Sequence, residues 1–140
     1  MSCWRTAKCE TIKNIEEGYM LSALDKMGFS VDWDNKVVNG AFRSDGNRSV
    51  SCVLVSKEDG KPVEIGMNIS EREDGTNNIE VVADWYGKQY KDAAEFLKKF
   101  TLEYNTARVI DVMGNSRFYV EEEVEVENGK RQLTFVRRAA

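Results

Sequence analysis

The amino-acid sequence predicts an α+β protein in which two helices pack on a mainly antiparallel sheet, in the order β-α-β-β-β-β-α-β-β. Two segments carry apolar residues at helical spacing, whereas the segments around them alternate apolar and polar residues with a period of two. Asp-Gly and Asn-Gly dipeptides, which favour tight turns between antiparallel strands, separate some of the alternating segments. A chain of 140 residues has the usual size of one domain, so residues 1–140 are expected to form a single domain.

A strand and a helix are predicted in the N-terminal part of the chain. Residues 3–12 mix polar, β-branched and aromatic side chains, which favours a strand. Asn14 stands three residues before Glu17, a spacing typical of helix capping, so a helix is expected over about residues 15–27. Gly28 can adopt the left-handed conformation that ends such a helix. The apolar stripe of this helix comprises Met20, Ala23, Leu24 and Met27.

Four strands are predicted between the two helices, the first of them beginning near Val37. Cys52 is expected to be buried because it shares a strand face with Val50 and Leu54. The turn Asp59-Gly60 leads into the next strand, so these two strands are expected to form a hairpin. The apolar face of that next strand comprises Val63, Ile65, Met67 and Ile69. The apolar face of the last strand in this group comprises Ile79, Val81, Ala83 and Trp85.

The second helix follows Gly87 and is predicted to run to about Met113. Asp92 and Glu95 repeat the capping pattern at its start. Its apolar stripe comprises Ala93, Leu97, Phe100, Tyr104 and Ala107. These residues recur at steps of three and four, so they are expected to face the sheet.

A C-terminal hairpin is predicted around Asn128-Gly129, in a register that sets Glu127 opposite Lys130 and Val124 opposite Leu133. Strict alternation would place a row of glutamates on one face of its first strand: Glu121, Glu123, Glu125 and Glu127. This row is interpreted either as a solvated face that discourages aggregation or as an acidic ridge that contacts a partner. Its carboxylates would stand about 6.6 to 7 Å apart, close to the phosphate spacing of one nucleic-acid strand.

The absence of histidine is the strongest exclusion, because histidine is the usual general base near neutral pH and the commonest metal ligand. Serine and cysteine triads of the ordinary kind are therefore excluded. Cys3 and Cys9 are too far apart in sequence for a zinc knuckle, and no histidine exists to complete a ligand set. We therefore expect no metal, no cofactor and no catalytic residue, with a small enzyme that uses carboxylates as an alternative.

Charge and hydropathy narrow the classes of partner. The net charge of −4 argues against direct nucleic-acid binding, which rests on phosphate neutralisation. No apolar run approaches the roughly 18 residues of a membrane helix, and the N-terminal segment lacks an apolar signal region. Three cysteines in such a chain are expected to be reduced thiols. A cytoplasmic protein without membrane contact is the expectation.

Several short segments, in order and spacing, resemble a family of cyanobacteria and algal plastids called hypothetical chloroplast reading frame 35, or domain of unknown function 1257. The resemblance covers nearly the whole chain and includes Ile12-Lys13, residues 24–29, Glu64-Ile65-Gly66, Val82-Ala83-Asp84 before Tyr86-Gly87, Phe96-Leu97, Tyr104-Asn105 and Val136-Arg137. It implies an α+β fold without an established activity. The chain departs from the family at Cys3-Trp4, where members carry histidine, and its composition suits a bacterial or phage relative.

Three further residues are candidates for contact with a partner. Asp84 and Tyr86 are expected on the strand face opposite Trp85, where they could border a groove. The alternative is that this segment only connects a strand to a helix. Trp33, in a polar turn, is a candidate for a partly exposed aromatic contact.

Together these patterns predict a non-catalytic protein-interaction or accessory module that binds another protein. One alternative uses the glutamate row: an acidic inhibitor, of a phage anti-defence type, that docks on the basic nucleic-acid groove of a defence or nucleic-acid-processing protein. The oligomeric state is not predicted.

Overall fold

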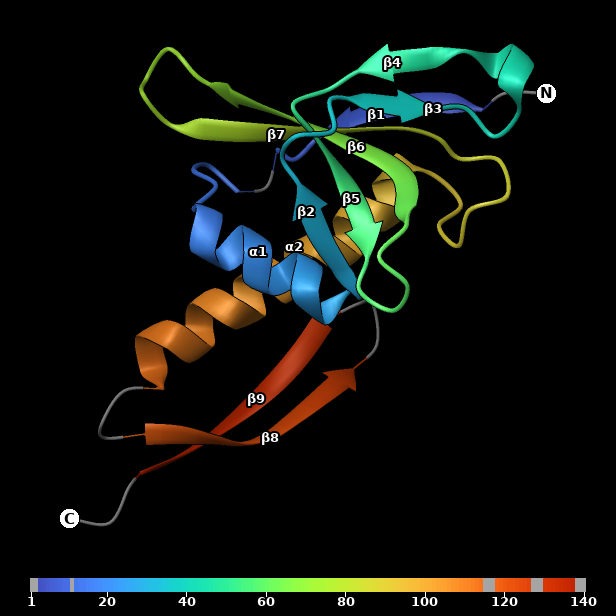
Figure 1. Cartoon of the computed structure of the whole chain (residues 1–140). Helices are drawn as coiled ribbons and strands as arrows, with labels where there is room; N and C mark the ends of the chain where they lie inside the picture. The colour runs from blue at the N-terminus through green and yellow to red at the C-terminus, as the bar shows by residue number, and fades with distance from the viewer. Residues whose placement is uncertain (1–2, 11, 115–117, 127–129, 138–140) are drawn as a thin grey trace.

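The computed structural model describes residues 3–10, 12–114, 118–126 and 130–137, and it confirms the predicted α+β fold (Figure 1). Two helices, α1 (Glu17–Lys26) and α2 (Ala93–Met113), combine with antiparallel strands. The central sheet has five strands, in the spatial order β1 (Trp4–Lys8), β7 (Asn77–Asp84), β6 (Pro62–Glu71), β5 (Cys52–Ser56) and β2 (Phe29–Asp32).

Both helices pack on one face of this sheet and bury the main core (Figure 1). The predicted stripe of the first helix is confirmed for Met20, Ala23 and Leu24. The predicted stripe of the second helix is confirmed for Ala93, Leu97, Phe100 and Tyr104, whereas Ala107 is only partly buried. The predicted apolar face of β7 is also confirmed. From the helices, from β7 and from the residue that follows β7, this core takes Met20, Leu24, Ile79, Val81, Ala83, Trp85, Phe96, Phe100 and Tyr104.

The two helix starts differ in how their main-chain donors are satisfied. Asp92 caps α2 as predicted, since its side chain accepts a hydrogen bond from the Glu95 N–H at 2.9 Å. The predicted cap by Asn14 is wrong. Glu16 holds the N-cap position of α1 without a side-chain cap, and its N–H donates to the Tyr104 hydroxyl at 2.8 Å. A tyrosine from α2 therefore replaces the local cap, while the Asn14 side chain accepts from Asn77 at the start of β7.

A two-stranded ribbon covers the opposite face of the sheet. It consists of β3 (Val37–Asn39) and β4 (Asn47–Ser49), joined through a short 3-10 helix, η1 (Arg43–Asp45). Val38 of the ribbon packs with Val53 and Val82 of the sheet, so β5 and β7 are buried on both faces. Cys52 is buried as predicted, but Val50 packs in this second cluster and not beside Cys52. The short strands β2 and β4 were not predicted.

The C-terminal hairpin lies against α2 and does not join the central sheet (Figure 1). It comprises β8 (Phe118–Val126) and β9 (Lys130–Arg137). Val126 pairs with Lys130, and Val124 pairs with Gln132. The predicted register is therefore wrong by one residue, because three residues and not two join the strands. The predicted turn at Asn128-Gly129 lies outside the described residues.

Gly66, on β6, provides a test of the packing between the ribbon and the sheet. A Cβ atom at this position would lie 2.6 Å from Cγ1 of Val50. We expect Gly66→Ala to lower the free energy of unfolding by about 1–3 kcal/mol because the overpacked core must shift. Urea denaturation would measure the loss, and adding Val50→Ala should recover part of it.

Gly18→Ala is the matched control, since nothing lies within 4 Å of a Cβ atom there. It should leave stability unchanged or raise it by up to about 1 kcal/mol in a helix. Equal stability of Gly66→Ala and the wild type would contradict the packing described for Val50.

Candidate interaction surface

The Asp84 side chain, at the end of β7, is fully buried at 0% exposure and binds three main-chain segments. One carboxylate oxygen accepts from the N–H of Cys3 at 2.7 Å and of Tyr86 at 3.2 Å. The other accepts from the N–H of Ala41 at 3.0 Å. Burial raises the pKa of this carboxyl, but its three N–H donors outweigh burial, and the pKa lies below the usual range.

This burial corrects the sequence-based expectation for Asp84. Alternation places its side chain opposite Trp85, as predicted, but the N-terminal segment and the loop after β3 cover that face at this point. Its carboxylate is therefore not available to a partner. Its role in the candidate surface is to hold the main chain at Tyr86 and at Ala41.

Two exposed aromatic rings lie on the main-chain segments that this buried carboxylate binds. Tyr86 is 49% exposed and Phe42 is 47% exposed. Their ring centroids are 5.3 Å apart, with the ring planes tilted by 47°. Ala41 precedes Phe42, and its N–H donates to the Asp84 carboxylate, which also accepts from the Tyr86 N–H. One carboxylate therefore holds the main chain beside both rings. We call Phe42 and Tyr86 the aromatic pair.

Polar contacts hold the loop that carries Phe42. The Phe42 N–H donates to the Asp45 carboxylate at 3.1 Å, which closes the short 3-10 helix. The Trp4 indole N–H donates to the Asp45 carbonyl oxygen at 3.1 Å, and the Arg48 guanidinium lies 4.4 Å from the centre of the Trp4 ring. Sequence reasoning missed Phe42, because its exposure depends on tertiary contacts with residues far along the chain.

Trp33 does not belong to this surface. It is 39% exposed and follows β2, where it lines a hollow of about 400 Å³ with Ile15 and Asn77. Asn77 begins β7, whereas Tyr86 follows the end of β7. An eight-residue strand spans roughly 23 Å. The structure thus places Trp33 and Tyr86 at opposite ends of this strand.

The predicted glutamate row is interrupted. A register shift between Val120 and Glu122 interrupts the regular pairing of the two strands at Glu121. Glu123 and Glu125 share one face, opposite Leu133 and Arg131 respectively. Glu127 lies outside the described residues. The strict alternation on which the predicted row of four glutamates depends is therefore not maintained through Glu121, because the pairing shifts by one residue there.

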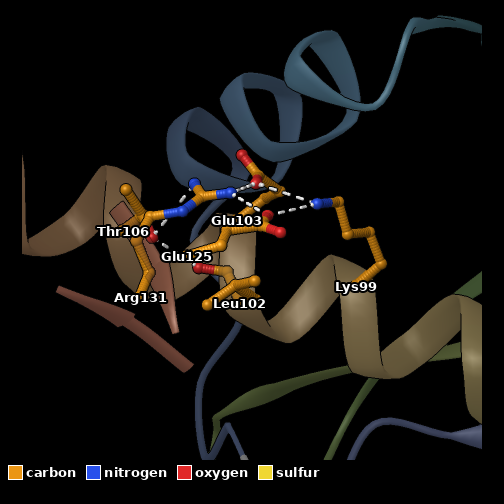
Figure 2. A network of polar contacts seen from close by, with 6 residues as sticks. All are labelled: Lys99, Leu102, Glu103, Thr106, Glu125 and Arg131. Atoms are coloured by element: carbon orange, nitrogen blue, oxygen red, sulfur yellow. Dashed lines mark hydrogen bonds and ion pairs between the residues drawn. The ribbon is translucent and has the colours of Figure 1, made fainter. Parts of the chain in front are cut away.

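Glu125 is bound within the molecule in a network between the hairpin and α2 (Figure 2). Its carboxylate accepts from Lys99 and from Arg131, each at 2.8 Å, and these hydrogen bonds lower its pKa. Arg131 also pairs with Glu103, a residue of α2 that is 4% exposed. Figure 2 shows the Arg131 guanidinium between the two carboxylates and near Thr106. Glu125 therefore belongs to a contact that attaches the hairpin to α2.

Three further possibilities for the described residues are a metal site, a reactive thiol and a membrane-spanning helix. Within the described residues, no group of three or more histidine, cysteine, aspartate or glutamate side chains is placed to hold a metal ion. Burial raises the pKa of the Cys52 thiol to about 11, so the thiol is protonated near neutral pH. In the part of the chain that the structure describes, no helix is long and apolar enough to cross a membrane.

No protein-family model, curated protein or solved structure matches the chain. The resemblance to the chloroplast reading-frame family therefore stays a prediction.

Asp84→Asn tests the anchoring carboxylate. The asparagine amide would turn an NH₂ group toward main-chain N–H donors, so we expect a loss of about 2–3 kcal/mol in the free energy of unfolding at pH 7. Because the folded-state pKa of Asp84 is lowered, its ionisation stabilises the fold above the unfolded-state pKa of about 3.9. That stabilisation disappears as the pH falls toward the folded-state pKa. Urea denaturation at pH 7 and pH 3 should show the difference from wild type narrowing in acid.

Asp34→Asn is the control, because Asp34 is exposed. It should change stability little at either pH. A difference between Asp84→Asn and wild type that stays constant from pH 7 to pH 3 would contradict the assigned role of the ionised carboxylate.

Arg131→Met tests the attachment of the hairpin. The substitution leaves the buried Glu103 carboxylate without its guanidinium partner, and such losses cost about 3–5 kcal/mol. Replacing both residues, Glu103→Leu with Arg131→Met, should restore much of the stability. Thermal unfolding would measure both variants, with Arg137→Met, at an exposed position of β9, as the control. A double variant no more stable than Arg131→Met would contradict the pairing.

Proposed function

We propose that the protein is a non-catalytic interaction module that binds another protein through the aromatic pair, Phe42 and Tyr86. The observation that carries this proposal is the exposure of both rings, about half each, on a backbone anchored by a buried carboxylate. Phenylalanine and tyrosine are both enriched in protein interfaces, and tyrosine is among the residues that most often dominate interface energy.

Pre-organisation supports this assignment. Binding costs free energy when loops and side chains must become ordered at the interface. The loop of Phe42 and the segment of Tyr86 share one hydrogen-bonding centre, and the rings already contact each other. A partner would therefore meet two large apolar surfaces whose main chain is held in place.

The buried acids support a non-catalytic reading. A carboxylate general acid normally has its pKa raised by its surroundings. The pKa of Asp84 is lowered, and its oxygens are used by main-chain donors. Glu103, the other buried acid among the described residues, pairs with Arg131. Both carboxylates thus have structural roles, which favours binding over the alternative of a small enzyme.

In this proposal the partner is a protein in the cytoplasm. A protein is favoured over a nucleic acid because the chain carries a net charge of −4. The alternative of an acidic inhibitor acting through the glutamate row receives less support. Its ridge is interrupted at Glu121, and the charge of Glu125 is balanced by Lys99 and Arg131.

The test is site-specific photo-crosslinking in the source cell. A photoreactive phenylalanine analogue replaces Tyr86, and in a second strain it replaces Trp33, another exposed aromatic residue, as the control. The expected result is one dominant protein adduct from position 86 that is absent from position 33.

The captured protein is then purified and titrated against variants of the chain. Phe42→Ala and Tyr86→Ala should each weaken binding at least about tenfold, as loss of an interface anchor does, while Trp33→Ala should not. Unchanged affinity in both aromatic-pair variants would overturn the proposal. Specific hydrolase or nuclease turnover by the purified protein, abolished by one carboxylate substitution, would overturn its non-catalytic part.

A further inference from the structure

A groove of about 770 Å³ lies along the outer face of α2, away from the aromatic pair. The end of β1 forms one wall, and β9 of the hairpin forms the other. Residues Ala94 to Val109 of α2 line its floor. This stretch of helix is about 22 Å long at 1.5 Å per residue. The groove is therefore elongated and open to solvent.

The floor of the groove is mainly apolar. Leu97, Leu102 and Val109 of α2 contribute to it, with Leu133 from the hairpin and Ala7 from β1. Leu97 is 9% exposed and Val109 is 37% exposed, so the floor runs from the edge of the core out to the surface. Apolar side chains gathered in such a concave site favour an apolar ligand group.

The rim of the groove is cationic, although the whole chain is acidic. Lys8, Lys98 and Lys130 are exposed and come from three different elements. None of these lysines forms an ion pair with the described residues, whereas Lys99, one position further along α2, pairs with two glutamates. Glu10 is the single acidic side chain among the described residues that line the groove. The charge of the rim is therefore available to an anionic ligand.

One wall of the groove belongs to a strand at the edge of the sheet, since β1 pairs with β7 on one side only. The Cys9 N–H donates to the Ile79 carbonyl oxygen at 3.0 Å. Alternation in an antiparallel pair then directs the main-chain groups of Thr6 and Lys8 away from β7. An edge of this kind can pair with an extended peptide.

We propose that this groove binds an extended segment of a partner protein in which acidic residues alternate with apolar residues. In an extended peptide, successive side chains point to opposite sides. One set lies on the leucine floor, and the other set reaches the lysines of the rim. A length of about 22 Å accommodates six or seven residues at roughly 3.3 Å each. This site is separate from the aromatic pair and goes beyond the function proposed for it.

The probe is a synthetic peptide of eight residues that alternates leucine and glutamate, with blocked ends. It is titrated into the full-length, isotope-labelled protein, and amide shifts are followed by nuclear magnetic resonance. We expect the shifts to concentrate along α2, the end of β1 and β9. A serine–glutamate peptide and a leucine–lysine peptide of the same length should bind at least about tenfold more weakly, because each lacks one half of the complementarity.

Charge reversal tests the rim. Lys98→Glu combined with Lys130→Glu should weaken binding of the leucine–glutamate peptide at least about tenfold and reduce its salt dependence. Lys61→Glu is the matched control, an exposed lysine in the turn before β6, and should leave affinity unchanged. Phe42→Ala should also leave it unchanged, which separates this site from the aromatic pair.

The proposal would be overturned by the absence of shifts at millimolar peptide, by shifts confined to residues outside the groove, or by equal binding of the serine–glutamate peptide. Groove shifts caused by a twelve-carbon fatty acid but not by the peptide would also overturn it, since they would assign the groove to a small amphiphile.

Discussion

The buried carboxylate of Asp84 joins three parts of the chain that are far apart in sequence. It binds the main chain of Cys3, 81 residues earlier, and of Ala41, 43 residues earlier. Without the carboxylate, three main-chain N–H groups would lose their acceptor. These groups belong to the N-terminal segment, to the loop after β3 and to the segment after β7. Because a half-satisfied buried polar cluster is more costly than an apolar one, the three segments and the carboxylate must be positioned together. The loop after β3 and the segment of Tyr86, which carry the exposed aromatic pair, are both held by this arrangement.

Local sequence patterns correctly predicted the elements whose burial pattern and capping depend on residues close in sequence. The alternation from Ile79 to Trp85 and the cap of α2 at Asp92 involve only neighbours in sequence, and both are confirmed. The errors arise where a distant residue takes over. Tyr104 replaces the expected cap at Asn14, because the hydroxyl of α2 reaches the Glu16 N–H. The face of Val50 depends on a ribbon that a period-two pattern does not reveal.

The candidate surfaces show the same limit. Tyr86 could be selected from sequence, but its ring partner Phe42 lies 44 residues away and no local signal marks it. Composition also misrepresents the distribution of charge. The most acidic strand places Glu125 against two cations of its own molecule, whereas three lysines that form no ion pair with the described residues gather along the groove beside α2. Net charge therefore describes this molecule poorly at the scale of a binding site, because pairing within the fold decides which charges face solvent.

The pairing of β1 with β7 has a consequence for synthesis. Trp4 lies opposite Asp84, so the first strand leaves the ribosome about 80 residues before its partner strand is complete. At about 5–20 residues per second, that interval lasts roughly 4–16 s. During this time α1 and the hairpin of β5 and β6 can assemble from local contacts, but the N-terminal strand has no edge to join. The nascent chain therefore passes through a state in which β2, β5 and β6 can form a three-stranded precursor while the leading segment stays unattached, and closure of the sheet is a late, long-range step.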